Sequence, residues 1–430
     1  MTPEVKQRIE QIRQGIVPEG YKKTKAGILP ESWSVRTIAE CLERVEHPVE
    51  VQANEMYTQI GIRSHGKGLF YKEPVTGDSL GNKSVFWIEP DCFILNIVFA
   101  WEQAIGKTTQ AEAGMIGSHR FPMYRPINGS IDIDYLIAYL LTKRGTDILE
   151  AASPGGAGRN RTLGQDRFMK SRIVLPPLDE QKKIAEILST QDKVIELQGR
   201  KIEELKRFKK GCLEKMFPRK GQKVPEKRFP GFTDDWEQRK LSEMCGTFEY
   251  GLNAAAKEFD GKNKYIRITD IDDASREFLL SDLSSPDICL DGMSKYLLSS
   301  GDIIFARTGA SVGKTYIYRE NDGIVYFAGF LIRAKVNQDN DAEFVFQSTL
   351  SPSYEKYIRI TSQRSGQPGV NAQEYGEYDL FAPSKEEQQR IGHFLRGIDN
   401  LITLHQRKKE VITNQRKTLQ QYLLNGIIRV

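Results

Sequence analysis

The segment "PPLDEQKKIAEILSTQDKVIEL", Pro176 to Leu197, returns 207 positions later as "PSKEEQQRIGHFLRGIDNLITL", Pro383 to Leu404. Identical or similar side chains recur throughout the two copies. The matched pairs include Glu180 with Glu387, Gln181 with Gln388, Ile184 with Ile391, Leu188 with Leu395, Asp192 with Asp399 and Ile195 with Ile402. A segment repeated at this distance predicts two tandem structural units, each of about 200 residues.

Each copy opens a stretch with the periodicity of a long helix. Residues 179–217 contain no proline, and their apolar side chains keep a 4-3 spacing for more than four heptads. The second copy keeps the same phase, so the two stripes can bury each other as a coiled coil. The seam positions are Ile184, Leu188, Ile195, Ile202 and Leu205 in the first helix, and Ile391, Leu395, Ile402, Ile412 and Leu419 in the second.

Two polar residues, Gln198 and His405, fall at matching positions on this seam. Polar side chains on a seam can fix the register of two helices at some cost in stability. We therefore interpret His405 as a structural residue, with a ligand or a general base as the alternative. A helix of about 39 residues would be roughly 58 Å long, which makes it a rigid spacer.

Other segments repeat as well, and the repeat closes on itself. "ESWSVRTIAE", Glu31 to Glu40, aligns with "DDWEQRKLSE", Asp234 to Glu243. Near the chain end, "LLNGII", Leu423 to Ile428, resembles "IRQGIV", Ile12 to Val17. A circular arrangement, with antiparallel long helices and the N-terminal helix packed beside the C-terminal one, would explain this pattern. Chance similarity over six residues is the alternative.

The regions between the long helices contain short apolar stretches bounded by glycine and turn residues, which are typical of strands. Residues 131–152 and 341–358 have helical patterns late in each region. The sequence therefore predicts an α+β protein with two mixed α/β domains. The predicted divisions are an N-terminal helix at 1–17, a first mixed domain at 18–175, a long helix at 176–218, a connector at 219–232, a second mixed domain at 233–382 and a C-terminal long helix at 383–430.

The composition is that of a soluble globular protein, with 39% hydrophobic and 28% charged residues. A formal net charge of +5 permits an acidic partner such as nucleic acid without requiring one. The five cysteines form no C-x-x-C pair, which argues against zinc and against a disulfide framework. Apolar runs are too short to span a bilayer. These features favour a reducing cytoplasm and no membrane partner.

One stretch, "RTGASVGKTYI" from Arg307 to Ile317, has the Gly-Lys-Thr ending of a phosphate-binding loop. Such a loop reads G-x-x-x-x-G-K-[ST], whereas only three residues separate Gly309 from Gly313. Thr308 stands where the first glycine is needed, and its Cβ restricts the backbone there. An NTPase centred on Lys314 is therefore a disfavoured alternative.

The first half of the chain has a related segment, "AIGKT" from Ala104 to Thr108, which pairs with "SVGKT", Ser311 to Thr315, again 207 positions apart. No glycine precedes it at four or five positions. A phosphate cradle would not lose its first glycine in one half, so we interpret both segments as a shared structural turn. Catalytic signatures are also missing: the sequence has no [DNS]-P-P-[YFW] tetrad, no G-x-S-x-G elbow and no cluster with metal-ligand spacing.

The duplicated "PPLDEQKKIAEIL" segment, the connector "GQKVPEKRFPGFTDDWEQRKL" and "GDIIFARTGASVGK" occur in an order that closely resembles the specificity subunits of type I restriction-modification systems. The resemblance covers essentially the whole chain. It implies that each mixed domain is a target recognition domain and that the two long helices pack as an antiparallel coiled coil with a circular pseudo-twofold repeat.

The resemblance also implies a function. The chain would read a bipartite target in double-stranded DNA, one half-site per recognition domain, with the spacer set by the helices. It would dock two methyltransferase subunits, which bring S-adenosylmethionine and methylate adenine, and restriction subunits that use ATP and Mg²⁺. The chain itself would have no active site, no metal and no cofactor. A coiled-coil scaffold without DNA affinity is the alternative.

Loops rich in cationic, amide and hydroxyl side chains supply the candidate DNA contacts, because such groups bind phosphates and base edges. Each loop taken alone is also typical of a solvated turn. In the first domain the candidates are Arg63, His65, Lys67, Lys107, His119, Arg120, Arg159, Asn160 and Arg161. In the second they are Asn253, Arg307, Ser311, Lys314, Gln363, Arg364, Gln367 and Asn371.

Overall fold

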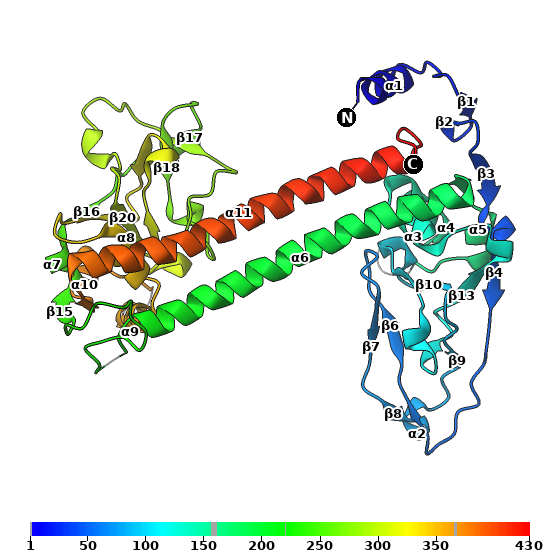
Figure 1. The fold of residues 1–430 in the computed structure, drawn as a ribbon, viewed down its shortest axis with the longest axis horizontal. Coiled ribbons are helices and arrows are strands. Elements are labelled where there is room, and N and C mark those ends of the chain that lie inside the picture. The colour runs from blue at the N-terminus through cyan, green and yellow to red at the C-terminus, as the bar shows by residue number, and fades with distance from the viewer. Residues whose placement is uncertain (1, 156–160, 220, 365–367) are drawn as a thin grey trace. The chain divides into compact units, whose positions relative to one another are not determined.

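The computed structural model describes residues 2–155, 161–219, 221–364 and 368–430 (Figure 1). Its contacts divide the chain into two compact units. Unit 1 comprises Met1–Glu196 and Glu410–Val430, and unit 2 comprises Leu197–Lys409. The limits of the units fall inside the two long helices, so each unit holds one mixed domain with part of each helix. The divisions expected from the sequence fall at the helix ends instead.

The two long helices are α6, Leu178–Met216, with 39 residues, and α11, Lys385–Leu424, with 40 residues. Each begins directly after a proline-containing segment, because proline disfavours helical backbone in the residue before it. Acidic residues in the first turn of each helix complement the positive end of the helix dipole.

In unit 1, the start of α6 packs against the end of α11. Ile184 and Leu188 are buried in one core with Leu423. Arg416 on α11 forms an ion pair with Asp192 on α6 at 2.8 Å. The two helices therefore run antiparallel in this unit, as the resemblance implied.

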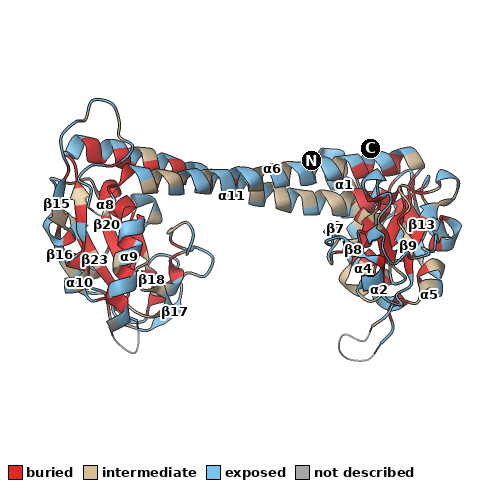
Figure 2. Ribbon diagram, turned by 90° about the horizontal axis from the view of Figure 1, so that it is seen from below, coloured by how far each residue is buried: buried red, intermediate tan, exposed pale blue. Residues whose placement is uncertain are grey.

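Unit 2 has the complementary arrangement, with the end of α6 packed against the start of α11. Ile202 is buried in one core with Ile391 and Leu395. Across the seam, His405 Nδ1 lies 2.7 Å from Gln198 Oε1. The other seam positions range from buried Ile402 to the half-buried Leu205 of unit 2 and Ile195, Ile412 and Leu419 of unit 1. Figure 2 shows that the middle of both helices is mainly exposed.

The mixed domain of each unit is built on a four-stranded antiparallel sheet. In unit 1 the strand order is β11-β10-β13-β4, and in unit 2 it is β21-β20-β23-β16. These strands are β4 Leu42–Val45, β10 Phe93–Leu95, β11 Ile105–Lys107 and β13 Met123–Pro126 in unit 1, and β16 Cys245–Tyr250, β20 Asp302–Ala306, β21 Thr315–Ile317 and β23 Leu331–Val336 in unit 2. The expected fold class, α+β with two mixed domains and long antiparallel helices, is confirmed.

The register of these sheets changes the correspondence between the two halves. Phe93 pairs with Lys107, and Ile303 pairs with Ile317. Beyond these pairs, the Asn96 amide donates to the Ala104 carbonyl and the Ala306 amide donates to the Lys314 carbonyl, each at 2.9 Å. The two hairpins therefore match at an offset of 210 residues, which places Lys107 at the position of Ile317. The expected match of "AIGKT" with "SVGKT" at an offset of 207 is wrong, because strand pairing and not the shared Gly-Lys-Thr letters determines which residues are equivalent.

Smaller elements complete each domain. In unit 1 they are α1 Pro3–Arg13, β1 Tyr21–Thr24, β2 Gly27–Pro30, β3 Ser34–Thr37, β5 Met56–Tyr57, β6 Ile60–Ile62, β7 Leu69–Tyr71, β8 Val75–Thr76, α2 Gly77–Leu80, β9 Val85–Trp87, β12 Ile116–Ser118, α3 Ile133–Leu140, α4 Lys143–Ala152, α5 Gln165–Lys170 and β14 Arg172–Leu175. In unit 2 they are β15 Glu237–Lys240, α7 Leu241–Met244, β17 Ala256–Glu258, β18 Lys264–Ile266, β19 Ser284–Pro286, β22 Val325–Phe327, α8 Ala342–Ser348, α9 Pro352–Thr361, α10 Ala372–Gly376 and β24 Asp379–Ala382.

Each of the two helical patterns late in a domain forms a pair of helices and not one continuous helix. The first divides into α3 and α4 because the Thr142 hydroxyl caps the N-terminus of α4 by accepting from the Gly145 amide at 3.2 Å. The second divides into α8 and α9, where Ser351 is the N-cap and Pro352 the first helical residue. Proline is favoured there because its missing amide is not needed.

The repeated glutamine at the start of each long helix explains part of the sequence repeat. Gln181 Oε1 accepts a hydrogen bond from the Asp132 amide at 2.9 Å, and Gln388 Oε1 accepts one from the Asp341 amide at 3.0 Å. Asp132 and Asp341 are the N-caps of α3 and α8. The same side chain thus joins the long helix to the mixed domain in both units.

The glutamate before each of these glutamines is also buried. Glu180 accepts from the Trp33 indole at 3.0 Å and is paired with Arg429 at 2.5 Å. Glu387 is paired with Arg228, which donates two hydrogen bonds at 2.7 and 2.8 Å. The chain end in unit 1 therefore supplies the partner that the connector supplies in unit 2.

The N-terminal segment lies against the chain end within unit 1. Arg8 Nη1 donates to the carbonyl of Ile427 at 2.8 Å, and the Tyr21 hydroxyl donates to that of Gly426 at 2.6 Å. Gly15 and Gly426 follow the ends of α1 and α11 with φ values of 76° and 69°. Such left-handed glycines are common helix terminators. The similar "QG" and "NG" dipeptides therefore end two helices in the same way. Within the described residues, none of the helices is long and apolar enough to cross a membrane.

Candidate nucleic-acid interface

Four loops of unit 1 meet beside one end of its four-stranded sheet, at residues 63–68, 96–104, 118–121 and 161–163, here called junction 1. The His65 amide donates to the Glu102 carbonyl at 2.8 Å, and the Ser64 hydroxyl donates to the Glu102 carboxylate at 2.9 Å. Ile97 donates to the Arg120 carbonyl at 3.0 Å. The candidates Arg63, His65, Lys67, His119, Arg120 and Arg161 belong to these loops.

Four loops of unit 2 meet in the same way, at residues 250–254, 307–311, 328–330 and 368–371, here called junction 2. The Gly309 amide donates to the Pro368 carbonyl at 3.1 Å, and Thr308 forms a β-bridge with Gly369. Leu252 forms another bridge with Ala328. The candidates Asn253, Arg307, Ser311 and Asn371 belong to these loops, and Asn253 is exposed.

The two junctions share a backbone framework. In junction 1, Ile97 donates to Arg120 and its carbonyl accepts from Leu163 at 2.8 Å. In junction 2, Arg307 donates to Phe330 at 3.1 Å and its carbonyl accepts from Val370 at 2.9 Å. In each domain, a single residue that follows β10 or β20 thus holds two other loops through its backbone amide and carbonyl. The backbone is repeated although the side chains on it differ.

An arginine stacked on an aromatic ring is present at each junction. The Arg161 guanidinium lies 5.4 Å from the centre of the Trp101 ring, and that of Arg307 lies 5.0 Å from the centre of the Tyr250 ring. Such cation–π contacts orient the flat guanidinium group while its N–H donors remain available. Arginine held in this way can bind a phosphate or the acceptor edge of guanine.

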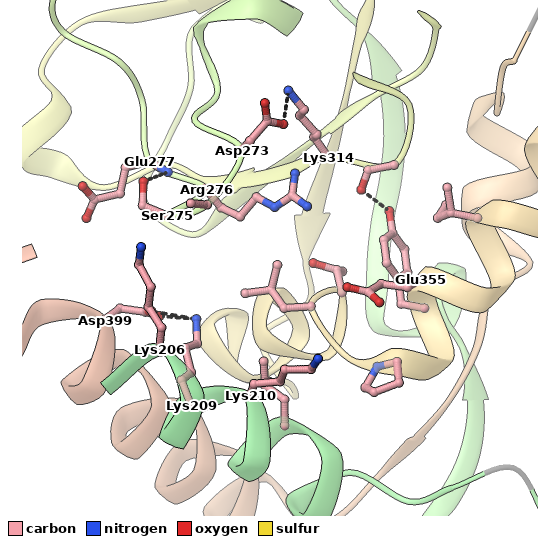
Figure 3. A pocket seen from close by; sticks show the side chains of 18 of the residues that line it. Lys206, Lys209, Lys210, Asp273, Ser275, Arg276, Glu277, Lys314, Glu355 and Asp399 are labelled. Atoms are coloured by element: carbon pink, nitrogen blue, oxygen red, sulfur yellow. Dashed lines mark hydrogen bonds and ion pairs between the residues drawn. The ribbon is translucent and has the colours of Figure 1, made fainter. Parts of the chain in front are cut away.

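Some candidates have partners elsewhere in their domain. Lys107 forms an ion pair with Asp134 in α3 at 2.8 Å. Burial opposes the charge of Lys107, but the hydrogen bond and the nearby carboxylates outweigh this effect and raise its pKa. Lys314 is paired with Asp273 at 2.5 Å, and 14% of its side chain is exposed. Lys314 also lines a cavity bordered by α6, and its ammonium group is directed toward Asp273 (Figure 3).

The loop around Gly309 and Gly313 uses its amides within the protein, which argues against a triphosphate cradle. Such a cradle needs several adjacent amides free to point at the phosphates. Here they are donated, from Gly309 to Pro368 O, from Val312 to Gly309 O, from Gly313 to Ala306 O and from Lys314 to Ser311 O, at 3.0 to 3.1 Å. The next element is the strand β21, whereas a phosphate loop opens a helix.

Asn371 has a structural role in the fold. Its side chain accepts from the Glu374 amide at 2.9 Å, and Glu374 accepts from the Asn371 amide at 2.9 Å, which forms a capping box at the start of α10. α10 carries Tyr375, whose hydroxyl donates to the Ala306 carbonyl at 2.6 Å, next to junction 2. Asn371 thus helps to hold the loop of Arg307.

Replacing Asn371 by alanine is expected to lower the free energy of unfolding of unit 2 by about 1 kcal/mol, because a helix N-cap is lost. Urea denaturation of the full chain measures the change. Unaltered stability together with altered DNA affinity would contradict the capping role and favour direct contact with DNA.

The remaining candidates are placed less fully. Arg159, Asn160 and Gln367 lie outside the described residues, and the side chain of Arg364 is not described. His119 and Gln363 are exposed. In the described part of the chain, no group of three or more His, Cys, Asp or Glu side chains is arranged to hold a metal ion.

Two aromatic residues at junction 2 were not among the candidates. Tyr250 stacks on Arg307, and its hydroxyl accepts from the Ala372 amide at 3.2 Å. Phe330 is 60% exposed. Exposed aromatic rings can stack on bases or insert between them. The sequence signal was weak, because an aromatic residue in a strand-forming stretch is more often buried.

Comparisons with known proteins agree with this architecture. A family model described as the type I restriction modification DNA specificity domain matches residues 84–207 and 233–414. The chain is 25% identical over 436 residues to the type I restriction enzyme MjaVIII specificity subunit of Methanocaldococcus jannaschii, covering 97% of this chain and 98% of that one.

Solved structures show the same fold. The S subunit of a type I restriction-modification system from M. genitalium superposes with a TM-score of 0.56 at 15% identity, covering 91% of this chain and 96% of that one. A chain from a structure on complex assembly of the type I R-M system gives a TM-score of 0.54 at 15% identity, covering 93% and 99%. With the two family-model matches spanning most of the chain, this protein belongs to the type I restriction-modification specificity subunits and carries two DNA-recognition domains.

Proposed function

We propose that this chain reads a bipartite DNA target, with one half-site per recognition domain and a spacing set by α6 and α11. It docks two methyltransferase subunits, which bring S-adenosylmethionine and methylate adenine in the half-sites. Restriction subunits add ATP- and Mg²⁺-dependent translocation and cleavage. The chain itself is the recognition component and contributes no catalytic group.

The observation that supports two-part reading is the shared framework of junctions 1 and 2. The same pair of backbone hydrogen bonds holds the loops in both domains, and each junction presents an arginine on an aromatic ring. A repeated backbone with different side chains is suited to reading two different short sequences, because base edges are distinguished by side-chain donors and acceptors.

The proposed base and phosphate contacts are the exposed and half-exposed polar residues of the junctions. They are Arg63, His65, Lys67, His119, Arg120 and Arg161 in the first domain, and Asn253, Arg307 and Ser311 in the second. Lys107 and Lys314 are weaker candidates, because each is already paired with a carboxylate. For Asn371 the capping role is the simpler one.

Arg307→Ala and Arg161→Ala are each expected to lower affinity for the target about tenfold, because a well-placed arginine contributes ~1–3 kcal/mol of discrimination. Methylated adenines are first mapped in cells with the intact system, which defines the target. Binding of the methyltransferase complex is then measured at fixed salt with the target and with duplexes scrambled in one half-site. Each variant should tolerate scrambling of a different half-site.

Arg239→Ala is the control for these variants. Arg239 is an exposed arginine on β15, paired with Glu237 at 2.6 Å, and it lies in neither junction. Affinity and preference should not change. If both junction variants relaxed the same half-site, one domain per half-site would be contradicted. Equal affinity of the unmodified complex for all duplexes would favour a scaffold without sequence recognition.

A further inference from the structure

Unit 2 contains a cavity of about 710 Å³ between its mixed domain and the long helices (Figure 3). Its walls come from α6, α9, α11, the segment 273–277 and the loop 310–314. Six cationic side chains line it: Lys206, Lys209, Lys210, Arg276, Lys314 and Arg359. A cavity of this size can hold a ligand as large as a nucleotide.

Two of these cations are neutralised by carboxylates in the cavity wall. Lys209 is paired with Asp399 at 2.6 Å, and Lys314 is paired with Asp273 at 2.5 Å. Glu214, Glu277 and Glu355 also line the cavity, and Glu277 accepts a hydrogen bond from the Thr403 hydroxyl at 2.9 Å. These contacts join the 273–277 segment to the loop before β21 and to α11. Lys209 and Lys314 therefore have structural partners within the protein.

Arg276 differs from these paired lysines. Its Nη1 atom is buried and has no hydrogen-bond partner among the described residues. The residue also adopts a φ of 60°, which is unusual for a side chain other than glycine. A buried guanidinium nitrogen without an acceptor is unfavourable, and the flat fork of arginine matches the oxygens of a phosphate.

Lys210 lies on the facing wall, on α6, and has no ion-pair partner among the described residues. Lys206, one turn before it, is paired with exposed Glu203 at 3.2 Å. In Figure 3 the lysines of α6 and the Arg276 guanidinium border the same open space from opposite sides. Cations on opposing walls can neutralise a doubly charged ligand from two directions.

We propose that this cavity binds an oxyanion of the phosphate class, with Arg276 and Lys210 as its principal donors. The phosphate belongs either to a free ion or small phosphate ester, or to the backbone of a nucleic acid. The cavity adjoins junction 2 through the loop that follows β20, but Arg276 and Lys210 belong to neither junction, so the site does not depend on sequence-specific reading by them. It gives Lys314 a role at the cavity wall, where its pairing with Asp273 shapes one side.

Calorimetric titration of the full chain with inorganic pyrophosphate tests the site. Binding should weaken at least about tenfold in Arg276→Gln and several-fold in Lys210→Gln, since each removes charge-assisted hydrogen bonds. The matched control is Arg207→Gln, which removes one positive charge from the exposed surface of α6 outside this cavity. Exposed Lys210 gives a variant that tests the site even if Arg276→Gln is destabilised, which thermal melting will show.

Two further measurements identify the source of the phosphate. If a nucleic-acid backbone occupies the cavity, pyrophosphate will compete with a random-sequence duplex. Arg276→Gln will then reduce the slope of log affinity against log salt by about one. If the ligand is a free ion or ester, the duplex slope will be unchanged while pyrophosphate binding is lost. Absence of pyrophosphate binding, or equal binding by all four proteins, would overturn the proposal.

Discussion

Leu395→Asp is expected to unfold unit 2. Leu395 is 0% exposed and belongs to the core that contains Ile202 of α6 and Trp236 at the start of the mixed domain. Aspartate loses the apolar packing and places a carboxylate inside an apolar core. The combined cost is about 5 kcal/mol or more, which is comparable to the whole stability of a typical domain.

The measurement is urea denaturation of the full chain, followed by circular dichroism and tryptophan fluorescence. Leu404→Asp is the matched control, because Leu404 lies on the same helix and is 60% exposed. This control should keep a free energy of unfolding within about 0.5 kcal/mol of the unmodified chain. If the two variants behaved alike, the packing of α6 against α11 would be wrong.

Arg228→Ala is expected to lower the free energy of unfolding of unit 2 by about 3–5 kcal/mol, because breaking a buried ion pair leaves a charge without a partner. The Glu387 side chain is 0% exposed, and Arg228 donates both of its ion-pair hydrogen bonds. The hydrogen bond to Glu387 raises the pKa of Arg228. Arg228 thus joins the connector to the first turn of α11.

Two further variants give this prediction its controls. Arg239→Ala removes an exposed ion pair with Glu237 and should cost less than about 1 kcal/mol. The double change Arg228→Met with Glu387→Met should recover much of the loss, because both charges are removed together. A loss for Arg228→Ala no larger than that for Arg239→Ala would show that the pair does not hold the connector.

The candidate site was only partly predictable from the sequence. Loops rich in arginine, asparagine and glycine were identified, and several of them meet at the two junctions. The partners within the junctions were not predictable. Tyr250 stacks on Arg307 and Trp101 stacks on Arg161 across large sequence separations. Asn371 looked like a DNA contact but caps α10, because the same side-chain amide serves both purposes.

The tandem repeat, the two long helices and their apolar seam were predictable from the sequence alone. These features depend on local periodicity, since a helix aligns side chains three and four residues apart wherever it lies. The repeated Glu-Gln pair was also visible in the sequence. Its role in joining each long helix to the mixed domain was not predictable.

Two features depend on the three-dimensional packing of the chain: which residues are equivalent in the two domains, and which cations are paired with a carboxylate. Strand pairing places Lys107 opposite Phe93 and at the position of Ile317. Lys107 and Lys314 therefore share a local sequence motif but not a structural position. Asp134 and Asp273 then neutralise the two lysines from elements far away in the sequence. Which carboxylate pairs with which lysine depends on how the elements pack in three dimensions. The order of residue types along the chain does not specify such contacts between distant elements.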